Sequence, residues 1–319
     1  VVHYGLRHWT SAAGAGEILR ALARLRPEVC HLNLPSPYEG LRNTVALWAR
    51  LAGAQRVVAT EHLPMAPRAR RRVLMKQLLM PAVDAFIVMT RSGEEDLRRI
   101  HAIPGEKIVR IPYGIDPAPE VRPEERAALL EEIGQPGARV LIGHLGRLTR
   151  RKGHHVLLEA LAQQRERLAA REVAVVFAGE GEEEENLRRQ IAASHLAGRV
   201  HLLGHRENAR RLIGILDLLV LPSFIETQPF VILEAMAAGV PVLSTAIYGI
   251  PDMVVSGETG LLVEPGDTAG LGAALARLVD DGAARDEMGA AARRRFDAHF
   301  RVDRMAARTA RIYNGGSAA

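Results

Sequence analysis

Several residue types that would decide the class of a protein are scarce in this sequence. Its 319 residues include one cysteine, Cys30, so there is no internal disulfide framework and a reducing compartment is favoured. Cys30 lies in a strand-like run and is interpreted as a small core residue. Aromatic residues make up only 4% of the chain. No apolar run reaches about 20 residues and no signal peptide is visible, so we expect a cytoplasmic protein without a membrane-spanning helix.

The charge balance is only mildly basic. The sequence has 42 Lys and Arg against 37 Asp and Glu, a net charge of +5. This excess permits anionic partners such as nucleotide phosphates or acidic lipid surfaces without choosing among them. A nucleic-acid-binding protein fits poorly, because basic and aromatic residues are not interleaved. The histidines show no metal-ligand spacing, so we expect no metal site and no cofactor.

Short apolar runs alternate with segments of helical periodicity along most of the chain, which indicates parallel βαβ units. The strands expected in the first half cover residues 1–4, 28–34, 55–60, 82–89 and 107–111. Those expected in the second half cover residues 139–145, 173–178, 200–203, 218–221, 240–244 and 260–263. We therefore predict an α/β protein with a first domain at 1–116, a linker at 117–137, a second domain at 138–300 and a C-terminal helix at 301–319 that can pack back on the first domain.

The most informative stretch runs from residue 218 to residue 244. A wholly apolar strand at 218–221 suits a parallel sheet covered on both faces. Pro229 suits the first turn of a following helix, Gly239 suits its C-cap, and Pro241 prevents continuation. The unpaired N–H groups of residues 227–230 would point out of the helix start, where they form an anion site, especially for phosphate.

Two acidic residues flank this helix start. Glu226 precedes it and could bind the hydroxyls of a sugar, while Glu234 lies on the helix and could bind a ribose attached to the phosphate. The alternatives are that Glu226 merely compensates the helix dipole and that Glu234 lies on a solvated face. Because the helix is otherwise almost entirely apolar, an ionised Glu234 without a partner would be costly.

A second candidate element is the turn at residues 146–153, which follows an apolar strand and opens a helix. It brings Arg147 and Lys152 to the carboxyl edge of the sheet, where α/β proteins bind ligands. Two fixed cations there could stabilise the charge of a departing diphosphate. A solvated basic turn is the alternative. His62 ends a strand of the first domain at the same kind of edge, and a structural role is its alternative.

These motifs resemble a known family. The run Glu226-Thr-Gln-Pro-Phe-Val-Ile-Leu-Glu234-Ala-Met-Ala-Ala-Gly-Val-Pro-Val resembles the Glu-x7-Glu signature of retaining, GT-B-fold glycosyltransferases of the family 4 type. The usual form is E-G-x-P-x-x-x-x-E-A-M-A-x-G-x-P-V, so Thr227 replaces a common glycine. The turn at 146–153 matches the family pattern G-R-L-x-x-x-K-G. Residues 112–116 resemble its P-N-G-I-D, with Tyr113 replacing asparagine.

The resemblance extends over about residues 27–313 and implies a GT-B fold, in which two Rossmann-like parallel-sheet domains face each other across a cleft. Family members begin with a strand, a Gly-rich loop and a helix. Nothing here matches that unit, so the first domain is expected to be incomplete and full activity is in doubt.

The resemblance also implies site residues. His62 would position the transferred sugar and Glu226 would orient it, and we treat these two as the catalytic positions. The turn containing Arg206 would lie near the nucleotide base. The implied donor-binding residues are Gly146, Arg147, Lys152, Arg206, Thr227, Gln228, Pro229, Phe230, Val231 and Glu234.

The function implied is a metal-independent, retaining hexosyltransferase that uses a nucleoside diphosphate-sugar and a glycan or lipid-linked acceptor, as in polysaccharide or lipopolysaccharide biosynthesis. Two alternatives stay open. A GT-B-fold nucleotide-sugar epimerase would use the same donor without an acceptor, and a non-catalytic nucleotide-sugar-binding protein would bind it without turnover.

The segment 67–80 is basic in its leading half and apolar in its trailing half. Its cationic residues could meet anionic headgroups while leucines dip into the bilayer, giving peripheral contact at the inner face of the membrane. The alternative is a helix that packs its leucines on the sheet. The cationic residues are Arg68, Arg70, Arg71, Arg72 and Lys76, and the leucines are Leu74, Leu78 and Leu79.

Overall fold

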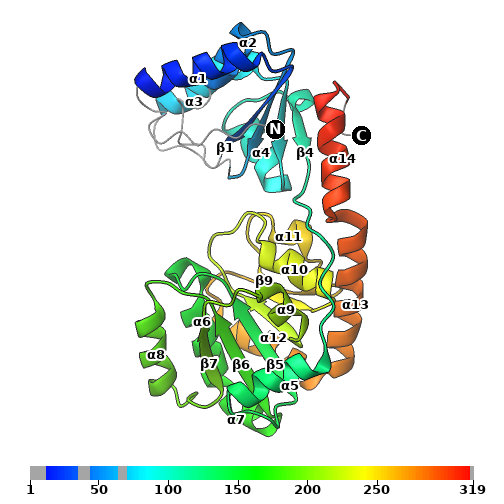
Figure 1. Ribbon diagram of the computed structural model, residues 1–319. Helices are drawn as coiled ribbons and strands as arrows, with labels where there is room; N and C mark the ends of the chain where they lie inside the picture. Colours follow the sequence, from blue (N-terminus) through cyan, green and yellow to red (C-terminus); the bar gives the residue numbers. More distant parts are fainter. Residues whose placement is uncertain (1–11, 35–43, 64–69, 317–319) are drawn as a thin grey trace. The chain divides into compact units, whose positions relative to one another are not determined.

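The computed structural model describes residues 12–34, 44–63 and 70–316 (Figure 1). The chain divides into two compact units, one formed by Val1–Pro112 with Met305–Ala319 and the other by Tyr113–Arg304. We call them unit 1 and unit 2. The strand expected at residues 1–4 lies outside the described residues. No helix in the described part of the chain is long and apolar enough to cross a membrane.

The described residues of unit 1 contain a four-stranded parallel sheet in the order β1-β2-β3-β4. The strands are β1 (Val29–Leu34), β2 (Arg56–Glu61), β3 (Ala85–Val88) and β4 (Ile108–Arg110). The helices are α1 (Ala12–Leu25), α2 (Thr44–Leu51), α3 (Arg70–Leu79), α4 (Arg91–Arg99) and α14 (Val302–Tyr313), which begins in unit 2 and ends in unit 1.

Side chains alternate between the two faces of this sheet, as the pleat requires. Val57 and Phe86 belong to a core that includes side chains of α1, α2 and α4. Val58 and Ile87 belong to a second core that includes Ile312 of α14. The last helix of the chain therefore covers one face of the sheet of the first unit.

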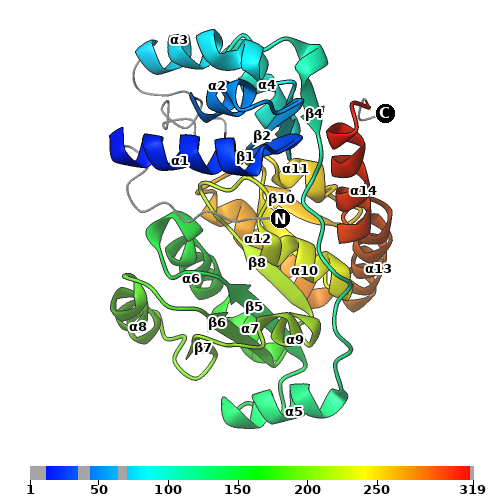
Figure 2. The same ribbon diagram turned by 45° about the horizontal axis from the view of Figure 1, so that its top comes forward.

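Unit 2, which the structure describes throughout, contains a six-stranded parallel sheet in the order β10-β9-β8-β5-β6-β7. Strands β8, β5, β6 and β7 of this sheet are labelled in Figure 2. Its strands are β5 (Val140–Leu145), β6 (Val173–Ala178), β7 (Val200–Gly204), β8 (Leu218–Leu221), β9 (Val242–Thr245) and β10 (Gly260–Val263). Its helices are α5 (Pro123–Glu132), α6 (His154–Gln163), α7 (Arg165–Ala170), α8 (Glu184–Ala193), α9 (Ala209–Gly214), α10 (Phe230–Ala238), α11 (Ile250–Met253), α12 (Thr268–Asp280) and α13 (Gly282–His299).

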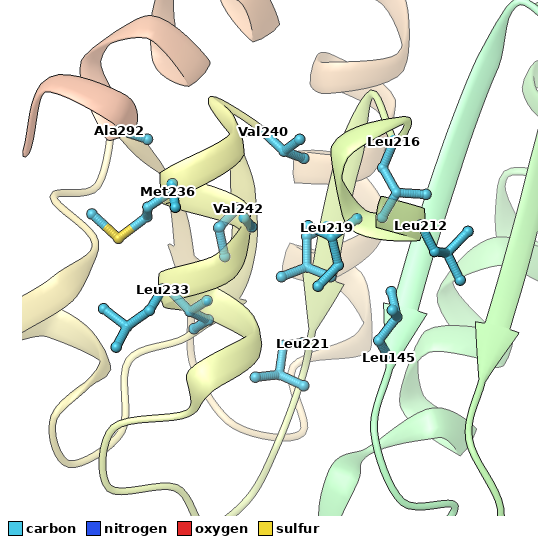
Figure 3. Close-up of a cluster of buried hydrophobic side chains, with 14 of the residues drawn as sticks. Leu145, Leu212, Leu216, Leu219, Leu221, Leu233, Met236, Val240, Val242 and Ala292 are labelled. Carbon is cyan, nitrogen blue, oxygen red and sulfur yellow. The ribbon is translucent and has the colours of Figure 1, made fainter. Parts of the chain in front are cut away.

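Two apolar cores cover the two faces of this sheet. One involves α6, α7, α8 and α12, and the other involves α5, α9, α10, α11 and α13. In the second core, Leu233 and Met236 of α10 belong to one cluster with Leu219 of β8, Val242 of β9 and Ala292 of α13 (Figure 3). Burying α10 on the sheet in this way fixes where its N-terminus lies.

The predicted α/β class with two parallel sheets is therefore confirmed. The segment expected as a linker at 117–137 contains α5 and belongs to unit 2, where Leu129 and Leu130 enter the core.

The structure corrects the interpretation of α3. Lys76, expected to meet lipid headgroups, is only 3% exposed and forms an ion pair of 2.5 Å with Glu61, the last residue of β2. Burial raises the pKa of Glu61, and the Lys76 ammonium opposes that shift. Leu74 and Leu78 are 57% and 71% exposed, so these two leucines do not pack on the sheet as the alternative expected. Arg68 lies outside the described residues.

We predict that Lys76→Ala destabilises the protein by about 3–5 kcal/mol, because it leaves the carboxylate of Glu61 buried and unpaired. The free energy of unfolding would be measured by urea denaturation. The double variant Lys76→Met, Glu61→Gln removes both charges and should recover most of the loss. Equal losses in the single and double variants would contradict this interpretation of the ion pair.

Candidate functional site

Three loops at the carboxyl edge of the sheet in unit 2 are joined by backbone hydrogen bonds. The loop after β5 is bonded to the loop after β6, because the Leu148 N–H donates to the Glu180 carbonyl (2.9 Å) and the Glu183 N–H donates to the Leu148 carbonyl (3.0 Å). It is also bonded to the loop after β8, because the Phe224 N–H donates to the Arg151 carbonyl (2.8 Å). These bonds fix the three loops relative to one another.

Two glycines permit this close approach. Gly153 has a φ of +74°, and a Cβ there would lie 1.9 Å from the carbonyl oxygen of Pro222. Gly179 has a φ of +144°, and a Cβ there would lie 2.0 Å from the carbonyl oxygen of Gly146. Any larger residue would push the loops apart, so glycine is required at both positions.

The N-terminus of α10 lies at this edge. Pro229 occupies the N-cap position, one residue before the helical turn predicted for it, and no side chain caps the helix. Gly239 ends the helix with a φ of +74°, as expected. The first N–H groups of a helix lack intrahelical partners, so this end presents donors and a partial positive charge. Thr227 and Val231, on either side of it, are half-buried.

The ammonium of Lys152 and the carboxylate of Glu226 form an ion pair across two of the loops. Their side chains are 12% and 10% exposed. Ser223 also donates to Glu226, with 3.2 Å between Oγ and Oε1. The sequence placed Lys152 and Glu226 at one mouth, and the structure brings their side chains into contact.

Arg147 lines a pocket of about 630 Å³ at the ends of β5, β6 and β7, together with Gly146, Glu180 and Arg206. Its side chain is exposed. Among the carboxylates of the described residues, none forms an ion pair with Arg147. Arg206 is different, because its guanidinium pairs with Glu132 of α5.

Glu234 is half-buried on α10, and its Oε1 lies 4.0 Å from Nε of Arg210. Burial raises the pKa of Glu234, while the Arg210 guanidinium partly opposes that shift. Gln228 and Phe230 contact Tyr113 with their side chains, by hydrogen bonds and by ring stacking respectively. A role for these two residues in a ligand site would therefore depend chiefly on the backbone.

His62 belongs to unit 1, where it follows β2 and is half-buried, and burial lowers its pKa. No sequence pattern indicates a role for its neighbour His31. The ring of His31 bonds the hydroxyl of Tyr313 through Nδ1 (2.5 Å) and the hydroxyl of Thr60 through Nε2 (2.7 Å). Tyr313 is 282 residues away in the chain, so only the fold could reveal this contact.

Beneath the 146–153 loop lies a second contact that the sequence did not predict. His144 and His154 are both buried, with ring centroids 4.0 Å apart, and each lies 5.5 Å from the ring of Phe177. Nδ1 of His144 carries the proton, because it donates to the carbonyl of Val220 (2.8 Å). Burial lowers the pKa of His154 to about 4 and that of His144 well below its usual value, and the nearby Lys152 ammonium adds to both shifts.

Within residues 12–34, 44–63 and 70–316, no group of three His, Cys, Asp or Glu side chains is arranged to hold a metal ion. The polar groups described at this edge of unit 2 include the exposed guanidinium of Arg147, the Lys152–Glu226 ion pair, the N-terminus of α10 and the half-buried carboxylate of Glu234.

This architecture is the GT-B glycosyltransferase fold. A glycosyltransferase from Rickettsia africae has a TM-score of 0.83 at 20% identity, covering 99% of this chain and 83% of that one. Anabaena Alr3699/HepE in complex with UDP and glucose has a TM-score of 0.80 at 21% identity, covering 96% of this chain and 83% of that one.

The sequence comparisons give the family. Residues 125–295, more than half of the chain, match Glycosyl transferases group 1, and residues 3–119 match Glycosyltransferase Family 4. The chain belongs to the group 1 glycosyl transferases.

Curated relatives have several different names. Alpha-D-kanosaminyltransferase of Streptomyces kanamyceticus is 30% identical over 228 residues, 70% of this chain and 57% of the relative. D-inositol 3-phosphate glycosyltransferase of Corynebacterium jeikeium is 33% identical over 240 residues, which cover 70% of this chain and 55% of the relative. The chain thus spans about half the length of the curated relatives that it matches.

We predict that unit 2 loses stability as the pH falls from about 6.5 toward 4. An unfolded histidine binds a proton near pH 6.5, whereas folded His154 stays neutral down to about pH 4. The unfolded state thus binds more protons in this window, and the free energy of unfolding falls by up to about 1.4 kcal/mol per pH unit for each such histidine.

Urea denaturation at several pH values would measure this slope. His154→Leu should flatten it, whereas His195→Asn, at an exposed position on the same unit, should leave it unchanged. An unchanged slope in His154→Leu would show that the buried pair is not the source of acid sensitivity.

Proposed function

We propose that this chain is a metal-independent, retaining glycosyltransferase. It would transfer a sugar from a nucleoside diphosphate donor held by unit 2 to a glycan or lipid-linked acceptor. The observation that supports this most directly is the arrangement at one sheet edge of unit 2. There the uncapped start of α10, the exposed Arg147 and the Lys152–Glu226 ion pair come together. Family membership and UDP-bound neighbours of the same fold add support.

In this proposal the diphosphate interacts with three sources of positive charge. The first N–H groups of α10 donate to its oxygens, Arg147 adds a guanidinium, and Lys152 adds an ammonium. An ammonium has three N–H donors, so Lys152 can bind a phosphate oxygen while it keeps Glu226 as a partner. Charge that develops on the diphosphate as the glycosidic bond breaks would be stabilised by groups that are already in place.

The carboxylates then act on the two sugars of the donor. Glu226, held by Lys152 and Ser223, accepts hydrogen bonds from hydroxyls of the transferred sugar. Glu234, about one helical turn past the first residue of α10, accepts from the ribose. Because Glu226 is tied into an ion pair, we assign it an orienting role and not that of a nucleophile. The departing phosphate helps to remove the acceptor proton, so the sugar is transferred to the same face.

His62 would help to position the transferred sugar from unit 1. A neutral imidazole suits this role, because it can donate one hydrogen bond and accept another. The lowered pKa of His62 favours that neutral form at pH 7.

We expect Arg147→Ala to weaken the binding of UDP or GDP at least tenfold, because it removes a guanidinium that pairs with no carboxylate in the described part of the chain. Isothermal titration calorimetry with each diphosphate would measure this. Arg150→Ala removes a neighbouring exposed arginine from the same turn and should leave affinity within about twofold.

If wild-type protein binds neither UDP nor GDP, the donor-site assignment is wrong. With a matching sugar donor, product that keeps the anomeric configuration of the donor and forms in the presence of EDTA would support the full proposal. Release of a free sugar or its epimer without an acceptor would favour an epimerase instead, and donor binding without turnover in acceptor extracts would favour a non-catalytic binding protein.

We further propose that α3 contacts an anionic membrane surface. Leu74, Met75 and Leu78 are exposed on this helix. The sequence has arginines at the preceding positions 70–72. Apolar side chains beside basic residues suit the boundary between headgroups and acyl chains. Lys76 has no part in this contact, since it is buried against Glu61.

Leu78→Glu should reduce sedimentation with vesicles of equal parts phosphatidylglycerol and phosphatidylcholine at least fivefold at low salt. The inserted carboxylate would have to enter the apolar layer and would meet anionic lipid. Gln77→Glu adds the same charge at a neighbouring, less exposed position and should have a smaller effect. Failure of the wild-type protein to sediment with these vesicles would remove the membrane proposal.

A further inference from the structure

Two short segments of unit 2, residues 113–116 and 300–302, lie side by side, and we call them the joint. The Ile115 N–H donates to the Phe300 carbonyl (3.0 Å), and the Val302 N–H donates to the Ile115 carbonyl (3.0 Å). Gly114 packs so closely that a Cβ there would lie 2.4 Å from the carbonyl oxygen of Arg301.

The chain passes between the two units next to each of these segments. One passage falls between Pro112 and Tyr113, and the other between Arg304 and Met305. Both covalent links between the units therefore start within a few residues of the joint. A conformational change in the joint would therefore alter the backbone at the start of both links.

Gln228 connects the joint to the loop that contains Glu226. Its side chain is 5% exposed. The Tyr113 N–H donates to its Oε1 (2.9 Å), and its Nε2 donates to the Tyr113 carbonyl at a longer 3.5 Å. A buried side-chain amide thus serves both backbone polar groups of the first residue of unit 2.

Phe230 makes a second connection to the same residue. Its ring stacks on the ring of Tyr113, with centroids 5.1 Å apart and an angle of 24° between the planes. Phe230 is the first residue of α10, so the two residues that flank Pro229 both hold Tyr113. The helix end proposed to bind the diphosphate is therefore fixed to the joint at two points.

We propose that Gln228 and Tyr113 are positioning residues that couple occupation of the diphosphate site to the joint. This inference rests on the proposed function. The backbone N–H groups at the start of α10 would bind the diphosphate, while the side chains of the same segment hold Tyr113. A ligand that orders this segment thereby orders the joint, and by reciprocity a change in the joint alters affinity for the ligand.

The coupling can be tested by measuring hydrogen exchange of the amides of residues 113–116 in the full chain. The measurement is made with and without saturating UDP, or with GDP if calorimetry shows that GDP binds more tightly. In wild-type protein the diphosphate should slow this exchange at least fivefold. In Gln228→Met, exchange at Tyr113 without ligand should be at least tenfold faster, because its N–H loses its acceptor. The slowing by diphosphate should also disappear, with Kd raised about threefold to tenfold.

Two variants separate coupling from a general structural role. Gln190→Met makes the same chemical change on α8 and should behave as wild type. Gln228→Glu keeps an acceptor for the Tyr113 N–H but loses the donor, so it should retain part of the protection. If Gln228→Met does not fold cooperatively, Phe230→Leu can be used instead, because it removes only the ring stack. In this variant the diphosphate should slow hydrogen exchange at residues 113–116 by half as much as in wild type, or less.

The outcomes distinguish this inference from the function on which it rests. If Gln228→Met and Phe230→Leu bind diphosphate and show the wild-type slowing at residues 113–116, the coupling is wrong while the donor site stands. If wild-type protein binds neither UDP nor GDP, the donor site and the coupling are both wrong.

Discussion

The ion pair between Lys152 and Glu226 is the contact on which the geometry of the sheet edge in unit 2 depends. It joins the loop after β5 to the loop after β8, and both side chains are largely buried. Removing one partner would leave the other charge unpaired in a poorly solvated place, which is strongly destabilising. The close packing of Gly153 against Pro222 holds the same two loops at the backbone level.

The order of the strands explains why these two loops meet. From β5 the chain continues outward to β6 and β7, then returns to place β8 on the other side of β5. The order reverses at this point, so the loop after β5 and the loop after β8 follow neighbouring strands at the same edge of the sheet. Ligands of open α/β sheets bind at such switch points. Lys152 and Glu226 lie on opposite sides of this one.

Much of this fold could be predicted from local sequence. The strands at 173–178, 218–221 and 260–263 match the prediction at both ends, because each is a short apolar run between turn residues. The contacts that could not be predicted join residues far apart in the chain. The buried partner of Glu61 and the tyrosine that bonds His31 are examples. Periodicity identifies a face of a helix or strand but not the residue that meets it.

The stretch around Pro229 is a further case in which local sequence does not reveal what a side chain contacts. The family resemblance implies that Gln228 and Phe230 bind the donor, yet their side chains contact Tyr113. A helix N-terminus offers backbone N–H groups, so the proposed site requires the backbone path of residues 227–230 more than their side chains. Such a motif tolerates Thr227 in place of glycine as long as that path is kept. The side chains are then available for contacts elsewhere, and in this chain two of them hold the joint.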